Sequence, residues 1–368
     1  MKINNVARSR RDDALVSTIA IVFVATLVAP LGGARADTPP PNPSQNELEK
    51  EPAFDFSARG RLQVRYTHES EAESNQVELP RARVILRGDY KKLLELDLGM
   101  DFGGFDAEVA NAFLNVRAYK KHLQVRAGRM KRPFLRQFMN SAFGLVLAER
   151  SMLEDGFQAR RDLGVLLHNG DKDELEWALG IFGDLQPSDF AEETPEFRPV
   201  IAARVGYHQD GLDPYDEGDR RGGRFRIGGA LSALVHVDRT TAKVGERDTG
   251  YRLEGDVLMR VEGASIGLGA LYRAEDLVDP DFTRFVAGFG NVDYTFLHDY
   301  TVAARYSLTK RLENNEAPER TEHELTVGAV ARFFNDHLSV HVDGSWLRDT
   351  GFADETDSFR FRLQLGVK

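Results

Sequence analysis

The sequence of 368 residues contains no cysteine, and after residue 31 it has no long apolar run. A chain without cysteine avoids stray disulfides in an oxidising compartment, although many cytosolic proteins also lack this residue. No later apolar run reaches the roughly 18 residues that a membrane helix needs. Nucleophile-elbow and metal-binding motifs are missing too. These absences argue against membrane helices and against a recognisable catalytic or metal centre.

Acidic residues are missing between Glu108 and Glu149, although the whole chain has a formal net charge of -10. The cations in this acid-free interval are Arg117, Lys120, Lys121, Arg126, Arg129, Lys131, Arg132 and Arg136. A local positive field inside an acidic protein suggests that an anion is handled there.

The N-terminus has the architecture of a secretory signal peptide. A basic start that includes Lys2 and Arg8 precedes an apolar run over residues 14–31, and Ala34-Arg35-Ala36 is a small-x-small cleavage site. We predict a signal peptide over 1–36, a flexible periplasmic lead-in over 37–52 and a single domain over 53–368. An uncleaved membrane anchor is the alternative, which Pro30 and the cleavage site disfavour.

From Ala53 onward, apolar and polar residues alternate with a period of two, which is typical of β-strands. The fold class is therefore all-β. The predicted strands cover residues 54–67, 77–90, 93–102, 109–118, 122–131, 159–168, 174–183, 197–208, 222–238, 249–262, 264–274, 282–296, 300–310, 321–334, 337–348 and 357–367.

The connections between these strands alternate between short turns and longer polar loops. An outer-membrane barrel has an even number of strands, with short periplasmic turns and longer external loops. A closed ring also removes the unpaired edges of an open sheet. We therefore predict a 16-stranded antiparallel transmembrane β-barrel in the outer membrane of a Gram-negative bacterium, with an aqueous channel inside. One exception is the acidic segment 209–221, which is long where a short turn is expected.

If the apolar face of each strand contacts lipid, the opposite face lines the lumen. Guanidinium stays charged at any working pH, and its planar fork matches phosphate geometry. A lining of arginine is a general way to build anion selectivity. The predicted anion path contains Arg59, Arg61, Arg65, Arg81, Arg83, Arg87, Arg126, Arg360 and Arg362.

Acidic residues offer an alternative interpretation of this wall. Glu95, Asp97 and Asp101 point inward from the neighbouring strand and could neutralise much of it as structural ion pairs. Arg59, Arg61 and Arg65 have no acidic neighbour on the inward face of either flanking strand in the predicted register. We therefore predict that these three arginines are the least neutralised.

The third external loop, from Lys131 to about Gln158, is the longest, and residues 134–153 are too apolar for a solvent-exposed loop. Large barrels commonly fold one such loop inward to narrow the pore. The predicted constriction residues are Lys131, Arg132, Arg136 and Arg150. The alternative is a loop that packs over the barrel mouth or at a subunit contact.

Six motifs occur in order over residues 80–168: Arg81-Ala-Arg-Val-Ile-Leu-Arg-Gly, Leu96-Asp-Leu-Gly-Met-Asp-Phe, Asn111-Ala-Phe-Leu-Asn-Val, Val125-Arg-Ala-Gly-Arg-Met-Lys-Arg-Pro-Phe, Ala148-Glu-Arg-Ser and Arg161-Asp-Leu-Gly-Val. With these motifs the chain resembles the phosphate-selective porin O and P family. The resemblance implies a homotrimer of 16-stranded barrels and passive uptake of phosphate or polyphosphate. It places Lys131 and Arg150 at family motif positions. The ending Gly366-Val367-Lys368 departs from the aromatic residue that usually closes such barrels.

We predict an outer-membrane porin for small anions, with no catalytic activity, no cofactor, no metal and no nucleic-acid partner. Its other partner is outer-membrane lipid. A general, weakly selective porin is the alternative. A barrel hydrolase would need a Ser-His-Asp or His-carboxylate site, and the scattered His68, His236 and Ser307 show no supporting spacing. A structural or adhesin barrel would be expected to have longer external loops.

Overall fold

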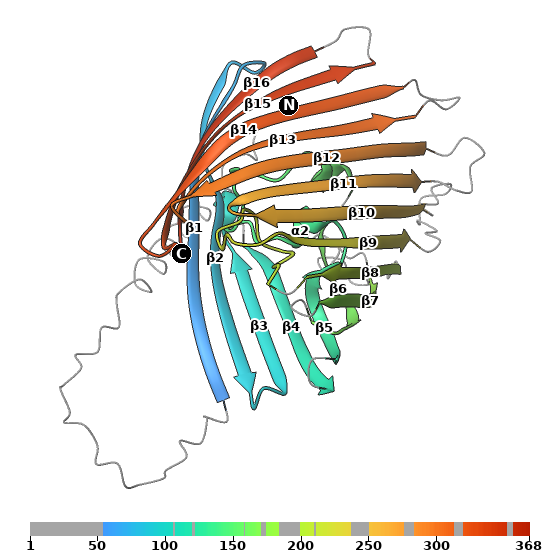
Figure 1. Cartoon of the computed structure of the whole chain (residues 1–368). Coiled ribbons are helices and arrows are strands. Elements are labelled where there is room, and N and C mark those ends of the chain that lie inside the picture. The colour runs from blue at the N-terminus through green and yellow to red at the C-terminus, as the bar shows by residue number, and fades with distance from the viewer. Residues whose placement is uncertain are drawn as a thin grey trace, which may run out of the picture.

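The computed structural model describes residues 54–105, 107–119, 122–157, 159–170, 174–183, 199–209, 211–236, 250–275, 283–312, 319–351 and 356–368. Sixteen antiparallel strands form a closed barrel, in which each strand pairs with its sequence neighbours and β1 closes the ring against β16 (Figure 1). The predicted signal peptide and the whole of the predicted lead-in lie outside the described residues.

The strands at the start of the chain are the longest. Their bounds are β1 Phe54–Glu69, β2 Ser74–Tyr90, β3 Leu94–Asp101, β4 Glu108–Tyr119, β5 Leu123–Lys131, β6 Arg161–His168, β7 Leu175–Phe182, β8 Val200–His208, β9 Arg226–His236, β10 Gly250–Val261, β11 Ala264–Glu275, β12 Thr283–Phe296, β13 Tyr300–Arg311, β14 Arg320–Phe333, β15 Leu338–Thr350 and β16 Thr356–Val367.

The predicted fold class and the number of strands are confirmed, and strand boundaries shift by up to four residues, as two examples show. The predicted loop at 68–76 is a tight connection over residues 70–73, because β1 and β2 remain paired as far as Glu69 and Ser74. The ninth strand begins at Arg226 rather than at residue 222. The guanidinium of Arg226 donates hydrogen bonds to Asp219 and to the carbonyl of Gly222, and these bonds hold the preceding residues outside the sheet.

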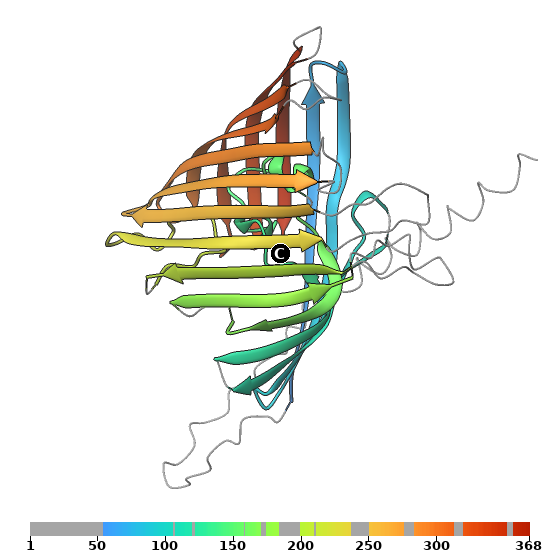
Figure 2. The same cartoon turned by 90° about the vertical axis from the view of Figure 1, so that its right-hand side faces the viewer.

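Apolar side chains cover the outside of the barrel, and polar side chains point inward. On β8, for example, Ile201 and Val205 are exposed while Arg204 and His208 are buried. The strands run obliquely around the ring (Figure 2). An outward apolar band on a closed ring is what a transmembrane barrel requires. No helix in the described residues is long and apolar enough to cross a membrane.

The connections after β2, β10, β12 and β14 are short turns at one end of the barrel, called the short-turn end here. Several have positive φ at both central residues, as at Lys91-Lys92 and Leu297-His298. This geometry matches the right-handed twist of the flanking strands in a hairpin. Aromatic rings gather there, with Tyr300 5.7 Å from Phe296 and 6.5 Å from Phe333 between ring centroids. Phe182, which by sequence alone fits a membrane girdle, is instead fully buried inside the barrel.

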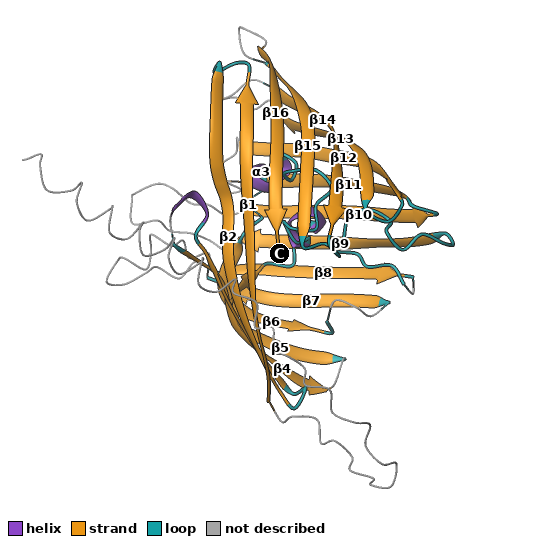
Figure 3. Cartoon of the chain, turned by 90° about the vertical axis from the view of Figure 1, so that its left-hand side faces the viewer, coloured by secondary structure: helices purple, strands orange, loops and turns teal. Residues whose placement is uncertain are grey.

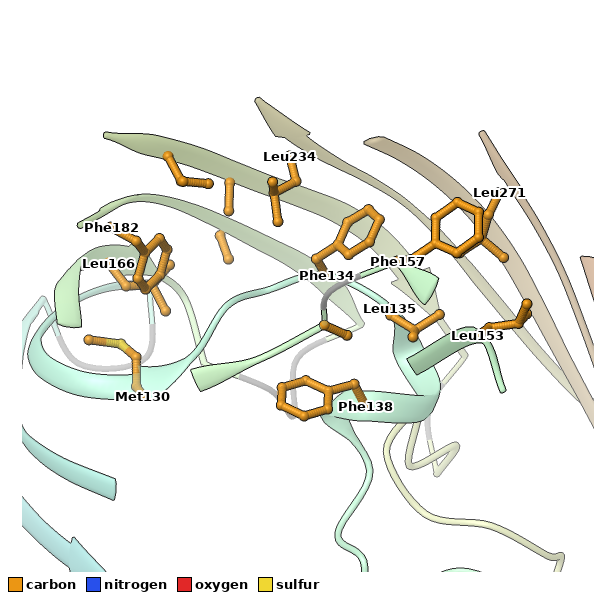
Figure 4. Close-up of a cluster of buried hydrophobic side chains, with 14 of the residues drawn as sticks. Met130, Phe134, Leu135, Phe138, Leu153, Phe157, Leu166, Phe182, Leu234 and Leu271 are labelled. Carbon is orange, nitrogen blue, oxygen red and sulfur yellow. The ribbon is translucent and has the colours of Figure 1, made fainter. Parts of the chain in front are cut away.

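Part of the lumen is filled by an apolar cluster. Phe134, Leu135, Leu153 and Phe157, in the connection from β5 to β6, are completely buried against side chains from the inner faces of β4 to β9, β11 and β12 (Figure 4). Each such side chain contributes about 1.5–3 kcal/mol by leaving water. The aqueous channel stays a prediction, and apolar side chains supplied by the chain itself occupy part of the interior.

Two connecting segments supply the filling. Loop 3 (residues 132–157) contains the short helices α2, Arg136–Met139, and α3, Leu153–Gly156, which lie within the ring (Figures 1 and 3). The mouth segment (residues 211–225) joins β8 to β9 at the short-turn end. Loop 3 enters from the opposite end, and both segments contact inward-facing side chains of the wall.

Candidate permeation path

Most arginines of the predicted wall are held in ion pairs. The carboxylates that bind them come from neighbouring strands and from loop 3. The pairs are Arg65 with Glu78 and Glu149, Arg81 with Glu149, Arg83 with Asp101, Arg87 with Glu95 and Asp97, Arg360 with Glu69, and Arg362 with Asp343. An adjacent opposite charge cancels much of the field that each guanidinium would project into the lumen. The alternative of structural neutralisation therefore holds for most of this wall.

Arg65 was predicted to be free of acidic neighbours, and this is wrong. The pairing of β1 with β2 shifts between Gln63 and Arg65, so that Glu78 lies opposite Arg65. Arg65 Nε is 2.7 Å from Glu78 Oε1, and Arg65 Nη1 is 2.7 Å from Glu149 Oε2. The bulge adds one residue to β2 and so reverses its inward parity, from odd residues such as Arg81 to even residues such as Glu78, and the assumption of unbroken alternation missed this change.

Arg59 and Arg61 form the least neutralised part of the wall. Arg61 donates a hydrogen bond of 3.2 Å to the Ser141 hydroxyl, and its guanidinium lies 5.2 Å from the centre of the Phe143 ring. Arg59 is exposed to the lumen. Among the described residues, no carboxylate lies within ion-pair distance of either side chain.

These two arginines share a small recess with Arg87 on the inner face of β1 and β2. Ser57, Arg59, Arg61, Ile85 and Arg87 line it, and its volume is about 40 Å³. The register explains the grouping, because Ser57 lies opposite Arg87 and Arg61 lies opposite Arg83. The recess lies toward the short-turn end, where the side chain of Arg87 is 48% exposed. A small anion there would meet several guanidinium groups at once.

Arg126 lies apart from this group, on β5. Its guanidinium is stacked 4.5 Å from the centre of the Phe113 ring. A cation over an aromatic face is held by the ring quadrupole. The structure thus divides the predicted arginines among a recess, an ion-paired wall and a stacked pair.

The four cations predicted for the constriction stabilise the conformation of loop 3 through hydrogen bonds and ion pairs. Lys131 Nζ donates to the carbonyl oxygens of Phe138, Met139 and Asn140 at 2.6, 2.9 and 2.8 Å. This ammonium group therefore closes the C-terminal end of α2. The predicted place of Lys131 at a constriction stays a prediction.

The other three cations are buried. Arg132 pairs with Asp162 at 2.6 Å, and Arg136 lies 3.3 Å from Asp256. Arg150 donates to the carbonyl oxygens of Gln137 and Asn140. Their location gives them a structural role within loop 3, and their predicted role in the lining is untested.

Glu149 is the main link between loop 3 and the arginine wall, and the sequence reasoning missed it. Its two oxygens accept hydrogen bonds from Arg65 and Arg81 at 2.7 and 2.9 Å. Burial alone would raise the pKa of this carboxyl, but the charges and hydrogen bonds of Arg81 and Arg65 outweigh burial and hold the pKa well below its ordinary value. Two sequence signals mark Glu149, which closes the acid-free interval and belongs to the motif Ala148-Glu-Arg-Ser.

Acidic side chains on three other strands bind the backbone of loop 3. Glu254 accepts hydrogen bonds from the amides of Leu135 and Arg136, both at 2.9 Å. Asp343 accepts from the Ala148 amide at 2.7 Å, and Glu324 accepts from the Met152 amide at 3.0 Å. Loop 3 is thus fastened from β1 and β2 across to β10, β14 and β15, and it leaves less space than an open 16-stranded ring would.

Comparisons with known proteins find similarity at the level of structure. No protein-family model matches the chain, and no curated protein matches it. The outer-membrane protein OmpT of Vibrio cholerae superposes with a TM-score of 0.61 at 13% identity, covering 86% of this chain and 98% of that one. The trimer form of OmpT superposes with a TM-score of 0.59 at 13% identity, over 86% and 99% of the two chains.

The outer-membrane channel DcaP of Acinetobacter baumannii superposes with a TM-score of 0.60 at 11% identity, over 86% of this chain and 97% of that one. At these identities the comparisons establish the fold. The chain has the 16-stranded architecture of Gram-negative outer-membrane barrels, and its apolar exterior fits that membrane. Within the described residues, no group of three or more His, Asp or Glu side chains is arranged to hold a metal ion.

Proposed function

We propose that this protein is a non-enzymatic outer-membrane channel for the passive diffusion of small anions such as phosphate or polyphosphate. The observation that carries the proposal is the recess on β1 and β2, where Arg59 and Arg61 have no carboxylate within ion-pair distance among the described residues. Cations that are not neutralised attract anions along a pore, whereas ion-paired cations contribute little field. The other predicted wall arginines shape the path around this recess.

A weakly selective diffusion channel is the second candidate. Ion pairing of Arg65, Arg81, Arg83, Arg87, Arg360 and Arg362 favours it. The net charge of -10 also favours it. The two candidates differ in one measurable quantity, the ratio of anion to cation permeability.

The test is the reversal potential of the purified protein in a planar bilayer under a potassium chloride gradient. We expect a preference for chloride, which phosphate reduces by competing for the same recess. Arg59→Gln with Arg61→Gln should lower this preference. Arg320→Gln with Arg348→Gln is the matched control, because it removes two charges at the opposite rim, where Asp349 and Asp357 pair with them.

A cation-selective reversal potential in the parent protein would overturn the proposed anion path and leave the barrel intact. A larger loss of anion preference from Arg81→Gln with Arg83→Gln, which are ion-paired and do not line the recess, than from the Arg59 and Arg61 pair would show that ion-paired arginines dominate selectivity.

We also propose that the chain assembles as a homotrimer. One similar structure is a trimer form, that of OmpT from Vibrio cholerae. The resemblance of residues 80–168 to the phosphate-selective porins points to the same assembly. The mass of the detergent-solubilised protein, measured by light scattering with the detergent contribution subtracted, distinguishes one chain from three.

A further inference from the structure

The inner wall differs sharply between the two sides of the barrel. Ser265, Thr301, Ser307, Thr326 and Ser345 belong to strands β11 to β15, and at most 2% of each is exposed. These polar residues point into the lumen, yet water does not reach them. On the other side, Arg59 is exposed and half of the Arg87 side chain is open.

The mouth segment covers the short-turn end on the buried side. Asp219 accepts hydrogen bonds from Arg226 and from the Gly263 amide, the latter at 3.0 Å. Arg220 pairs with Asp336 at 2.5 Å and donates to the His298 carbonyl at 3.1 Å. The segment is therefore clamped to three successive turns, which connect β10 to β11, β12 to β13 and β14 to β15.

Further contacts fix the mouth segment against the wall. Arg260 on β10 donates to the carbonyl oxygens of Asp213 and Asp216 at 3.1 and 2.6 Å. The Tyr215 hydroxyl bonds to Glu176 on β7. A Cβ on Gly218 would lie only 3.2 Å from the Thr295 hydroxyl, so this residue packs directly on β12. The segment thus fills the lumen beneath loop 3.

Glu217 joins the mouth segment to loop 3. One carboxylate oxygen accepts a hydrogen bond of 2.9 Å from the Val146 amide, and the other accepts one of 3.2 Å from Asn140 Nδ2. The carbonyl of Val146 in turn contacts His341 Nδ1 on β15 at 3.2 Å. The two segments, which enter from opposite ends, are therefore hydrogen-bonded to each other through Glu217, and Gly218 lies next to the Val146 side chain.

We propose that loop 3 and the mouth segment form a single partition, with Glu217 as the positioning residue that joins them. The partition closes the lumen along β8 to β15 and confines solutes to the side of β1 to β4, where the recess lies. Only the expected effect of the partition on conductance rests on the proposed channel function. The partition itself can be tested without conduction.

The absence of native cysteine makes the test direct. Single cysteines replace inward-facing serines: Ser57→Cys reports the recess, and Ser265→Cys reports the covered wall. The detergent-solubilised, folded barrel is treated with a negatively charged methanethiosulfonate, and the added mass is followed with time. We expect Ser57→Cys to react at least about tenfold faster than Ser265→Cys, because nearly all of residue 265 is excluded from water.

Glu217→Ala is then combined with each reporter. This substitution removes both carboxylate oxygens that accept hydrogen bonds from loop 3. We expect the reaction at Ser265→Cys to become about tenfold faster or more, and the reaction at Ser57→Cys to change little. Glu217→Gln keeps an acceptor for the Val146 amide and should give an intermediate rate. Asp213→Ala is the matched control in the same segment, because within the described residues this carboxylate accepts a hydrogen bond only from the nearby Tyr215 amide.

Equal reaction rates at the two reporters in the parent protein would overturn the partition. Continued protection of Ser265→Cys in the folded Glu217→Ala variant would show that Glu217 does not join the two segments. In bilayers, the same variant should conduct more than the parent. A cation-selective parent with the expected labelling pattern would reject the anion path and retain the partition.

Discussion

Loop 3 and the mouth segment both fill the lumen, but different forces hold them there. Loop 3 is anchored by completely buried apolar side chains such as Phe134 and Phe157, together with buried ion pairs. The mouth segment is anchored mainly by charge, through the buried pair of Asp219 with Arg226 and the partly exposed pair of Arg220 with Asp336. Apolar burial withstands salt, whereas partly exposed ion pairs are screened by it. The comparison predicts that loop 3 is the firm part of the partition and the mouth segment is the adjustable part.

The largest effect is expected from the apolar anchor. Phe134→Ala should cost about 3–5 kcal/mol of stability, because a fully buried ring leaves a cavity behind. The measurement is the denaturant midpoint of the folded barrel, with protease sensitivity of loop 3 as the local readout. Phe334→Ala is the control, since this ring is 76% exposed at a turn and should change little. Equal effects of the two variants would show that the internal cluster does not hold loop 3.

A smaller effect is expected from the link to the arginine wall. Glu149→Gln removes a carboxylate that is about a quarter exposed and that binds both Arg65 and Arg81. Hydrogen bonds to charged groups contribute about 1.5–3 kcal/mol each, and partial exposure places the expected loss at the low end. Single-channel conductance should rise and fluctuate more. Glu108→Gln, which removes an exposed partner of Arg129, is the control and should leave conductance unchanged.

The two segments should also respond differently to acid. The pKa of Glu149 is lowered by Arg81 and Arg65 against the opposing effect of burial, so its stabilising contribution is present above the ordinary carboxyl range and is lost only when pH falls through the depressed value. The pKa of Asp216 is raised by burial and by Asp213 against the attraction of Arg260, so this group takes up its proton earlier.

Protonation of Asp216 favours the folded mouth segment, because a raised pKa means that the native state binds the proton more tightly than the unfolded chain does. Lowering the pH from 7 to about 4 should therefore detach neither loop 3 nor the mouth segment through protonation of Glu149 or Asp216. The measurement is reaction at Ser265→Cys as a function of pH, corrected for thiol ionisation with Ser57→Cys. Faster corrected reaction in acid would contradict this expectation.

The smallest effect is expected at the clamp on the turns. The Arg220 side chain is 32% exposed and its partner Asp336 is 28% exposed, so Arg220→Gln should cost about 0–1 kcal/mol. High salt should mimic the substitution in the parent and have less effect in the variant. Arg221→Gln, which loses one bond to the Gly211 carbonyl, serves as the control. An absence of salt dependence would show that the mouth segment is held by packing.

The barrel follows from repeated local signals. A period of two identifies each strand and its outward face, and alternating connection lengths identify the two ends of the ring. Arg59 and Arg61 were placed on the inner wall by parity alone, and the structure has them there. A closed ring of consecutive antiparallel strands needs no long-range information beyond this pattern, because each strand pairs with its sequence neighbours.

The permeation path depends on contacts that no local pattern contains. Glu149 and Arg65 form an ion pair although they are 84 residues apart in the sequence, and Glu217 accepts a hydrogen bond from Val146 across 71 residues. The bulge beside Arg65 also exchanged one of its neighbours for Glu78. Charge and parity therefore indicated which arginines face the lumen, but only the fold decided which of them remain un-neutralised.

The sequence by itself determined the 16-stranded barrel, its apolar exterior and the inward direction of the arginines, because these depend on neighbours one or two residues away. Only the tertiary structure decided how the interior is filled. Loop 3 and the mouth segment could each satisfy their apolar or charged groups in several ways, and the closed ring selects the arrangement in which they meet at Glu217.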